Sequence, residues 1–585
     1  MRFSLHSLAY IASLATTSAA QFPSAPSLIP IPSYTGCPPN GPLLPRPTNL
    51  AQSKHFQAAA DHLTSVLDSA VDGDIKAGWV VENVSFSLAV VSPNGEEDQN
   101  RSTRKPIWEY HHRAEQNTQG TSEVSGNSQY LVGSISKVYS DLVLLKSGVD
   151  ARDPVTKFFP ELASNESSIQ WDDITLEALA EHLAGIPPNQ ILEILRTKEP
   201  VAPVNSRPAY SQLSFLVFAL CLEKATGKSY AQLLNETIIQ PLNLDNTGVS
   251  PGISEKAVIP PGSSSWGTDF GYNAPGGGLY SSTNDLSRLM HATLDRTILD
   301  TPAEVHKWLK PTSMTSSPTT LVGKPWEILR NTNLVPKYPH NIDIYSKSGG
   351  SAGYASQMSL VDQYGVGFAL LTAGPAGSLD ILHRAVVGTF MPAVEEEARD
   401  QSKKYTGNWT TPMTTSATTA APISLSLAMD NGTGLHLASL TRNNASMLEG
   451  LRAIFKAEFL SFSAAILDSD LRIYPTGIET PVPSAEAQAM LSKSESPEAN
   501  CDSSANLIRQ DWHINMDIVP VDTAKMSDLP GQESLANYCM SWQATDWVYY
   551  GGKPMEKIVF VVDENTKAVV GVEVPGLRSG LLVRA

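Results

Sequence analysis

The chain has 585 residues, with 42 basic and 59 acidic side chains and a formal net charge of −17. This length predicts two or more folded domains, and 41% hydrophobic residues are enough to form buried cores, which argues against a disordered protein. The negative charge and the lack of a basic run of five or more residues argue against nucleic acid as a partner.

The first 20 residues have the three parts of a secretory signal peptide. Arg2 gives a positive start, an apolar stretch runs from Leu8 to Leu14, and small residues form a cleavage site before Gln21. We expect residues 1–20 to be a signal peptide and the mature protein to be secreted into the extracellular space. No later apolar run approaches the length of about 18 residues that spans a membrane, so we expect no membrane span. Seven glycosylation sequons agree with secretion: Asn83, Asn100, Asn165, Asn235, Asn408, Asn431 and Asn444.

Four cysteines are too few for a disulfide scaffold, but an oxidising compartment permits disulfides. We expect Cys501 to pair with Cys539, because both lie in the C-terminal region. Cys221 falls within an apolar helical pattern and is interpreted as a buried thiol, with a pairing to Cys37 as the alternative.

After the signal peptide, nine prolines predict an extended arm over residues 21–50. The pattern becomes globular from about residue 51, with a helix near 55–69. Two strand patterns, at 86–91 and around 108–110, follow and predict a β-hairpin.

The middle of the chain, roughly 134–300, consists mostly of helical patterns and loops. Strand patterns return at 343–346, 354–360 and 366–372, so strands at both ends of the region enclose helices. We assign residues 51–400 to one domain.

Beyond residue 400 the composition shifts. Residues 410–421 are rich in Thr, Ala and Pro and predict a linker. Alternating strands at 423–429 and 435–440 join across an Asn-Gly turn, and a further hairpin is predicted at 558–562 and 569–574. We therefore expect a separate β-rich domain over residues 401–585.

The strongest local signal for chemistry is an S-x-x-K motif at Ser134 and Lys137, followed by an amphipathic stretch. A helix starting at Ser134 places the hydroxyl and the amine one turn apart on the same face. The helix N-terminus favours negative charge on the serine oxygen, and a desolvated lysine beside it loses its proton and serves as a base. The structural alternative is that Ser134 is an ordinary helix cap.

Two further elements complete a candidate site. Lys347, Ser348, Gly349 and Gly350 leave one strand and lead toward another; on an edge strand they present a positive charge, a hydrogen-bond donor and an open approach to a substrate's carboxylate or carbonyl. Tyr210 precedes an apolar helix predicted from Leu213 to Lys224, and a phenol between two ammonium groups is able to accept the nucleophile's proton.

These elements, in this order, resemble the S-x-x-K serine hydrolase superfamily of class C β-lactamases, penicillin-binding proteins and their esterase relatives. The stretches that support the resemblance lie at 153–162, 182–187, 241–242 and 276–282. It covers about residues 51–395, and the whole chain is similar to fungal secreted β-lactamase-like proteins with an extra C-terminal β domain. It implies an α/β (α+β) fold with an antiparallel sheet flanked by helices.

The resemblance also implies the roles of the site residues. Ser134 is the acylated nucleophile, Lys137 its base, Tyr210 the proton carrier and Lys347 an electrostatic support. The backbone N–H groups of Ser134 and Gly350 form the oxyanion hole.

Two positions depart from the family pattern. Gln212 stands where the family has Asn, and its extra methylene is expected to displace the contacts to Lys137 and to a substrate carbonyl. Ser348 replaces a threonine but keeps the hydroxyl.

Two other kinds of hydrolase fit the sequence less well. A G-x-S-x-G motif at 349–353, with His383 downstream, matches a nucleophile elbow, but that motif needs a helix after the turn and Tyr354 begins a strand pattern. A metallohydrolase is disfavoured because only His111 and His112 lie close together and no H-E-x-x-H motif occurs. We expect no cofactor.

The sequence thus predicts a secreted hydrolase that cleaves an ester or amide of a small molecule or peptide through a Ser134 acyl-enzyme. The alternatives are an acyltransferase of the same fold in secondary-metabolite biosynthesis and a catalytically inactive binding module.

Overall fold

The structure of this chain is a computed structural model. It describes residues 33–93, 104–163, 167–187, 199–412, 421–458, 470–492, 506–515, 518–521, 529–531, 546 and 548–585. The predicted signal peptide at 1–20, the sequons at Asn100 and Asn165, and Cys501 and Cys539 lie outside the described residues.

An eight-stranded antiparallel sheet forms the centre of the first domain. Its strand order is β3-β2-β14-β13-β12-β11-β10-β9. The strands are β2 (Ser85–Val91), β3 (Trp108–His112), β9 (Ser313–Met314), β10 (Thr320–Val322), β11 (Glu327–Asn331), β12 (Ile342–Ser351), β13 (Tyr354–Val361) and β14 (Val366–Ala373). β2 and β14 are buried along their whole length because helices cover both faces of the sheet, which explains why their sequences are mostly apolar. The predicted strands at 86–91, 343–346, 354–360 and 366–372 are confirmed.

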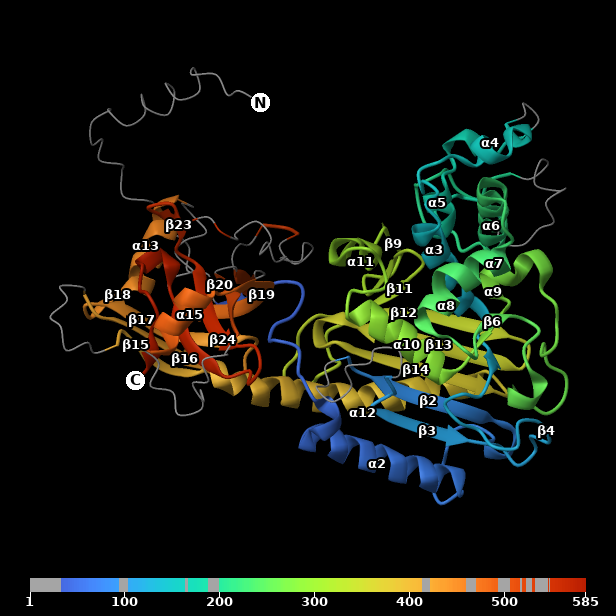
Figure 1. Cartoon of the computed structure of the whole chain (residues 1–585), viewed down its shortest axis with the longest axis horizontal. Coiled ribbons are helices and arrows are strands. Elements are labelled where there is room, and N and C mark those ends of the chain that lie inside the picture. The colour runs from blue at the N-terminus through green and yellow to red at the C-terminus, as the bar shows by residue number, and fades with distance from the viewer. Residues whose placement is uncertain are drawn as a thin grey trace.

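Two long helices cover one face of this sheet, α2 (Lys54–Val71) and α12 (Gly377–Ser402), as Figure 1 shows. The Ser53 side chain caps α2 by accepting a hydrogen bond from the backbone N–H of Phe56. The rings of Phe56 and Phe390 stack at 4.8 Å between the two helices. The helix predicted near 55–69 is therefore confirmed, and an aromatic contact fixes it against α12.

The other face carries the remaining helices of the domain, with α3 and α10 near the sheet (Figure 1). They are α3 (Ser136–Lys146), α4 (Val155–Phe158), α5 (Leu176–Ala180), α6 (Gln212–Thr226), α7 (Tyr230–Leu234), α8 (Gln240–Leu242), α9 (Ala274–Gly277), α10 (Thr283–Leu294) and α11 (Pro302–Trp308). Short strands link them: β4 (Gln119–Gly120) with β7 (Val258–Ile259), and β8 (Leu279–Ser281) with β5 (Tyr130–Leu131) and β6 (Gly248–Val249). The prediction of a mostly helical region over 134–300 is confirmed.

The second domain is a nine-stranded antiparallel sheet. Its strands are β15 (Gly407–Thr410), β16 (Ile423–Ala428), β17 (Leu435–Arg442), β18 (Ala445–Ser446), β19 (Arg472–Pro481), β20 (Leu507–Asn515), β24 (Lys557–Asp563), β25 (Val569–Glu573) and β26 (Val583–Arg584). Val572 of β25 exchanges backbone hydrogen bonds with Leu582, next to β26 at the opposite end of the strand order, so the sheet is nearly closed. Its core includes Tyr405, Trp512 and Phe560, whose rings contact one another. Helices α13 (Met447–Glu458) and α15 (Ser484–Leu491) and the pair β22 (Tyr549–Tyr550) and β23 (Lys553–Pro554) complete it.

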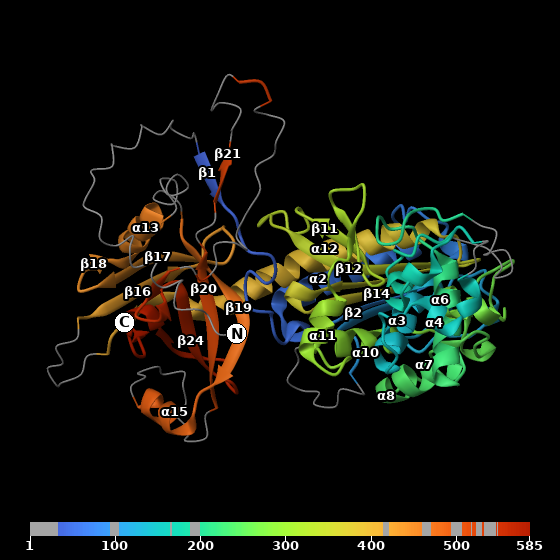
Figure 2. The ribbon, with the colours of Figure 1, turned by 90° about the horizontal axis from the view of Figure 1, so that it is seen from above.

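Two segments connect the domains. Helix α12 runs from beneath the first sheet to the second domain, so the boundary expected at residue 400 falls in its last turn (Figure 1). The described part of the proline-rich arm begins with β1 (Ser33–Gly36), which pairs with β21 (Ile518–Val521) of the second domain (Figure 2). The arm then reaches the first domain, where Arg46 Nη2 lies 2.7 Å from Asp362 Oδ1.

The structure decides the predictions for two of the cysteines. Cys221 is a free, buried thiol, as interpreted from its apolar helix, whereas Cys37 is disulfide-bonded. These two therefore do not pair with each other. The predicted pair of Cys501 with Cys539 lies outside the described residues.

Among the described residues, every helix is too short or too polar to cross a lipid bilayer. The sequon residues within this part of the chain differ in exposure. Asn408, Asn431 and Asn444 are exposed, and Asn83 and Asn235 are half-buried.

The stacked rings between α2 and α12 give a stability prediction. We expect Phe56→Ala to lower the free energy of unfolding by about 3–5 kcal/mol, because it leaves a cavity beside Phe390. Phe56→Leu, which keeps much of the apolar volume, should cost less. Denaturant unfolding followed by tryptophan fluorescence measures both changes, and equal losses would show that the cavity is not the cause.

Candidate active site

Ser134 lies at the N-terminal end of α3, in a one-turn 3₁₀ segment over Gly133–Ile135. The helix predicted to start at Ser134 begins two residues later, because residues 133–135 form the 3₁₀ turn, in which Gly133 has a positive φ of 49°. A Cβ on Gly133 would lie 2.4 Å from the backbone nitrogen of Gly350. A glycine is thus required for both the conformation and the close approach of the two segments. Lys137 Nζ lies 3.0 Å from Ser134 Oγ, so the predicted contact is present.

The side chain of Lys137 is fully buried and has three polar neighbours. Besides Ser134 Oγ, these are the Gln212 side-chain carbonyl, at 2.6 Å, and the backbone carbonyl of Gly276. Burial holds the pKa of Lys137 well below its usual range; the positive charge of Lys347 lowers this pKa further, and the Glu327 carboxylate partly opposes the shift. A neutral amine fits this environment, because its two N–H bonds match the two carbonyl acceptors and its lone pair faces the Ser134 hydroxyl.

Tyr210 completes the contacts of Ser134. Its hydroxyl donates to Ser134 Oγ at 2.6 Å, and its ring centre lies 4.9 Å from Lys137 Nζ and 5.3 Å from Lys347 Nζ. The structure therefore brings together the serine, both lysines and the phenol. The residue is 47% exposed, so solvent reaches this side of the site.

His182 supports the ring of Tyr210 from behind. The two rings stack with centres 4.4 Å apart and planes 28° apart. His182 Nδ1 accepts a hydrogen bond from the backbone N–H of Ser211 at 3.2 Å, which fixes the imidazole orientation. Burial and the nearby charges of Lys137 and Lys347 hold the pKa of His182 well below its usual range, so the imidazole is neutral.

Gln212 keeps its contact with Lys137 despite the extra methylene. The residue begins α6, and its Nε2 also donates to the Asn273 carbonyl at 3.4 Å. A Cβ on Gly276 would lie 2.1 Å from Gln212 Nε2, so this glycine makes the room that the longer side chain needs. The expectation that Gln212 displaces the Lys137 contact is wrong for this reason.

Lys347 and Ser348 lie on β12, which is not the edge strand expected from the sequence. β13 pairs with β12 over residues 345–351, and β11 pairs with its first half up to Ser346. The short strands β9, β10 and β11 were not predicted from the sequence, because two to five residues carry too little alternation to be recognised. The second half of β12 passes Ser134 on the side that β11 leaves open: a Cβ on Gly349 would lie 3.0 Å from the Ser134 backbone nitrogen.

Glu327, on β11, is a shared partner of Lys347 and Ser348 on β12. It forms an ion pair with Lys347 Nζ. It also accepts hydrogen bonds from the backbone N–H of Ser348 at 2.9 Å and from the Ser348 hydroxyl at 2.8 Å. Burial alone would raise the pKa of Glu327, but the Lys347 charge and these donors outweigh it and lower the pKa, so the side chain is a carboxylate.

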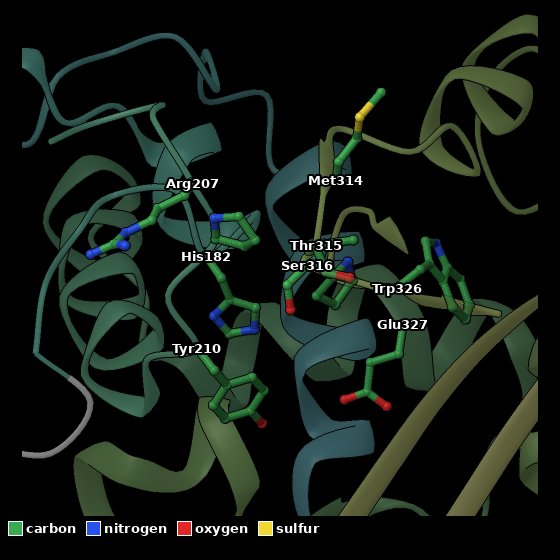
Figure 3. A pocket seen from close by; sticks show the side chains of 11 residues that line it. His182, Arg207, Tyr210, Met314, Thr315, Ser316, Trp326 and Glu327 are labelled. Atoms are coloured by element: carbon green, nitrogen blue, oxygen red, sulfur yellow. The ribbon is translucent and has the colours of Figure 1, made fainter. Parts of the chain in front are cut away.

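A pocket of about 580 Å³ opens beside these residues (Figure 3). His182 and Tyr210 form one side, and Trp326 and Glu327 face them across the pocket. The other residues that line it are Arg207, Pro208, Met314, Thr315, Ser316, Val322 and Pro325.

The nucleophile-elbow interpretation is wrong. Ser351 ends β12, a turn at Ala352 and Gly353 follows, and Tyr354 begins β13, so the required helix after the turn is replaced by a strand. His383 faces a different serine, with Nε2 3.2 Å from Ser359 Oγ.

Three residues of the site received no role from the sequence. His182 and Gly276 lie in stretches that supported the family resemblance, so only their motif context pointed to them. Glu327 is a single acidic residue at the start of a five-residue strand, and no sequence pattern marks it as the partner of a lysine 20 positions away.

Comparisons with known proteins agree with this geometry. A family model described as Beta-lactamase matches residues 89–387, and one described as a beta-lactamase-like C-terminal domain matches residues 397–585. The chain is 47% identical to a "Beta-lactamase-like protein" of Arthroderma benhamiae, over 94% of this chain and 96% of that protein. It is 22% identical to "Probable hydrolase M10" of Phoma sp., over 81% of this chain and 82% of that protein.

The Beta-lactamase/D-alanine Carboxypeptidase from Yersinia pestis is 20% identical, aligns with 56% of this chain and 99% of its own, and gives a TM-score of 0.43.

The charges around Lys137 give a prediction for pH dependence. If the neutral amine is the base, the rate of Ser134 acylation falls as the pH falls through the pKa of Lys137. Lys347→Met removes a charge that lowers this pKa, so it should move the acidic limb to higher pH; Glu327→Gln removes a charge that raises it and should move the limb to lower pH. The rate of fluorophosphonate labelling against pH measures both. Shifts in the same direction would contradict the assignment.

The fit between Gln212 and Gly276 gives a second prediction. We expect Gly276→Ala to lower the labelling rate about 10–100-fold, because the added methyl displaces the amide that holds Lys137. In the Gly276→Ala background, Gln212→Asn should recover part of the loss by removing the clash. Failure of the shorter amide to recover any activity would show that Gly276 matters for another reason.

Proposed function

The chain belongs to the β-lactamase family, and on that premise we propose that it is a serine hydrolase that cleaves an ester or amide through an acyl ester on Ser134. One observation carries this proposal: Ser134 Oγ lies between the Lys137 amine and the Tyr210 hydroxyl, at 3.0 and 2.6 Å. A serine oxygen with a base on one side and a proton carrier on the other is arranged for nucleophilic catalysis.

In the proposed acylation step, the neutral amine of Lys137 takes the proton of Ser134 as Oγ attacks the acyl carbonyl. The amine is available because burial lowers its pKa and so favours its neutral form. Tyr210 passes a proton to the leaving group, and stacking on His182 holds its ring in place. The product of the step is an ester between the acyl group and Ser134.

The proposed oxyanion hole uses backbone N–H groups of Ser134 and Gly350. The close approach of Gly133 to Gly350, and of Gly349 to Ser134, supports it, because both nitrogens then lie at the same junction of α3 and β12. Preorganised donors at such a position each contribute about 3–4 kcal/mol to lowering the barrier. Around Gly350 the space for a Cβ is open, so an acyl oxygen has room to approach.

Transfer of the acyl group to water is favoured over transfer to another acceptor. Tyr210 is half-exposed and lines the pocket, so water reaches the position from which it attacks the acyl ester. A site that excluded water would favour an acyltransferase. In the second step Tyr210 takes the proton of the attacking water, and Lys137 returns the proton to Ser134.

We further propose that the protein is secreted and glycosylated. The composition of residues 1–20 supports secretion, and the exposed Asn408, Asn431 and Asn444 are accessible to a glycosyltransferase.

Covalent labelling tests the proposed nucleophile. We expect intact-mass analysis to detect one adduct after treatment with a fluorophosphonate, and Ser134→Ala to abolish it. Ser351→Ala, which removes the serine of the rejected elbow motif, is the matched control and should keep the adduct. A folded wild-type protein that takes no label from fluorophosphonates, activated esters or β-lactams would instead support a catalytically inactive binding module.

A further inference from the structure

The donors that the sequence analysis assigned to a substrate already have an acceptor within the chain. Lys347 Nζ, the Ser348 backbone N–H and the Ser348 hydroxyl all bind the carboxylate of Glu327. The Glu327 carboxylate accepts hydrogen bonds from one ammonium group and from two further donors. It therefore occupies the position in which an anionic substrate group would bind. The site therefore carries its own carboxylate.

The position of Glu327 is fixed by its surroundings. It begins β11 in register with Ser346 of β12, and the preceding Trp326 is fully buried. To leave Lys347, the carboxylate would have to give up its ion pair and both hydrogen bonds from Ser348. The Lys347 side chain is only 1% exposed, so water cannot easily replace the lost partner.

The charges of the site balance without a ligand. Lys347 carries one positive charge and Glu327 one negative charge, and they lie in contact. Burial lowers the pKa of Lys137 and of His182, which disfavours the charged form of each. An anionic group would then meet the exposed side of Glu327, which is 36% accessible, and be repelled by it.

The residues that line the pocket favour an uncharged ligand. Most of its lining is apolar or aromatic, including Met314, Val322, Pro325 and Trp326. Arg207 is the other charged residue of the lining, and in Figure 3 its side chain extends away from the space between Tyr210 and Glu327. Nothing else among these lining residues supplies a positive charge to hold an anion.

We propose that Glu327 takes the place of a substrate carboxylate, so that the enzyme selects esters or amides whose acyl part is uncharged and apolar. The inference rests on the proposed function for its chemistry, but it concerns selectivity: Glu327 is a specificity-determining residue that excludes substrates with a carboxylate near the reacting carbonyl. Glu327→Gln removes the charge and keeps the shape, so Lys347 gains the capacity to bind an anion.

A pair of esters that differ in one charge tests this selectivity. Mono-p-nitrophenyl glutarate and its methyl ester share the leaving group and the acyl chain, so the ratio of their kcat/KM values cancels any general change in activity. We expect the wild type to favour the methyl ester by about tenfold or more, the effect of one charge-assisted hydrogen bond. Glu327→Gln should lose most of this preference by gaining activity on the free carboxylate.

Glu177→Gln is the matched control. It removes a carboxylate from another Lys–Glu ion pair near the same pocket without touching Lys347 or Ser348, and it should keep the wild-type ratio. A wild type that prefers the free carboxylate, or a ratio unchanged in Glu327→Gln, would overturn the inference.

Binding without turnover separates this inference from the proposed function. Calorimetry with phenylacetate and phenylacetamide compares a carboxylate with a neutral group of similar shape. We expect Glu327→Gln to gain about tenfold or more in affinity for phenylacetate relative to phenylacetamide. No gain refutes the role of Glu327 even if Ser134 is labelled by a fluorophosphonate, whereas a gain supports it even if labelling fails and the hydrolase proposal falls.

Discussion

The buried amine of Lys137 is the constraint on which the rest of the site depends. An ammonium ion in this position would lose its hydration and gain only two carbonyl partners, so the group is held in its neutral form. The surrounding structure serves this state: Gln212 and the Gly276 carbonyl take its two N–H bonds, and Ser134 is the remaining neighbour. Burial thus favours the neutral amine, the form of lysine that is able to act as a base.

The second lysine has the opposite environment and a different task. Lys347 is as buried as Lys137, but the carboxylate of Glu327 compensates its charge. Its field lowers the pKa of Lys137 across the cleft while its own hydrogen-bonding capacity is directed to Glu327. One acidic neighbour, Glu327, therefore gives the two lysines of the site different environments. Glu327 belongs to neither of the motifs that contain these lysines.

The sequence alone predicted those features that depend on the spacing of residues close together in the chain. Ser134 and Lys137 are three positions apart, so any helical turn brings them together, and the long strands β2, β13 and β14 have sequences that are typical of strands. The approach of Tyr210 and Lys347 to this pair depends on the fold, and only the family resemblance predicted it.

The errors arose where distant segments meet. Glu327 acts through a strand register that no local pattern encodes, and the fit of Gln212 depends on a glycine 64 positions later. The position of β12 was misjudged because β9, β10 and β11 are too short to show a period.

The pairing of β1 with β21 imposes an order on the folding of the newly made chain. Asn515 donates a hydrogen bond to the carbonyl of Cys37 across 478 positions, so the arm finds its partners only after most of the polypeptide has been synthesised. The entropic cost of closing a loop rises only with the logarithm of the loop length. The contact between the arm and the second domain is therefore stable even though it closes a long loop and forms late. The first domain is therefore able to assemble its sheet during translation. The arm pairs with the second domain afterwards and then connects the two domains.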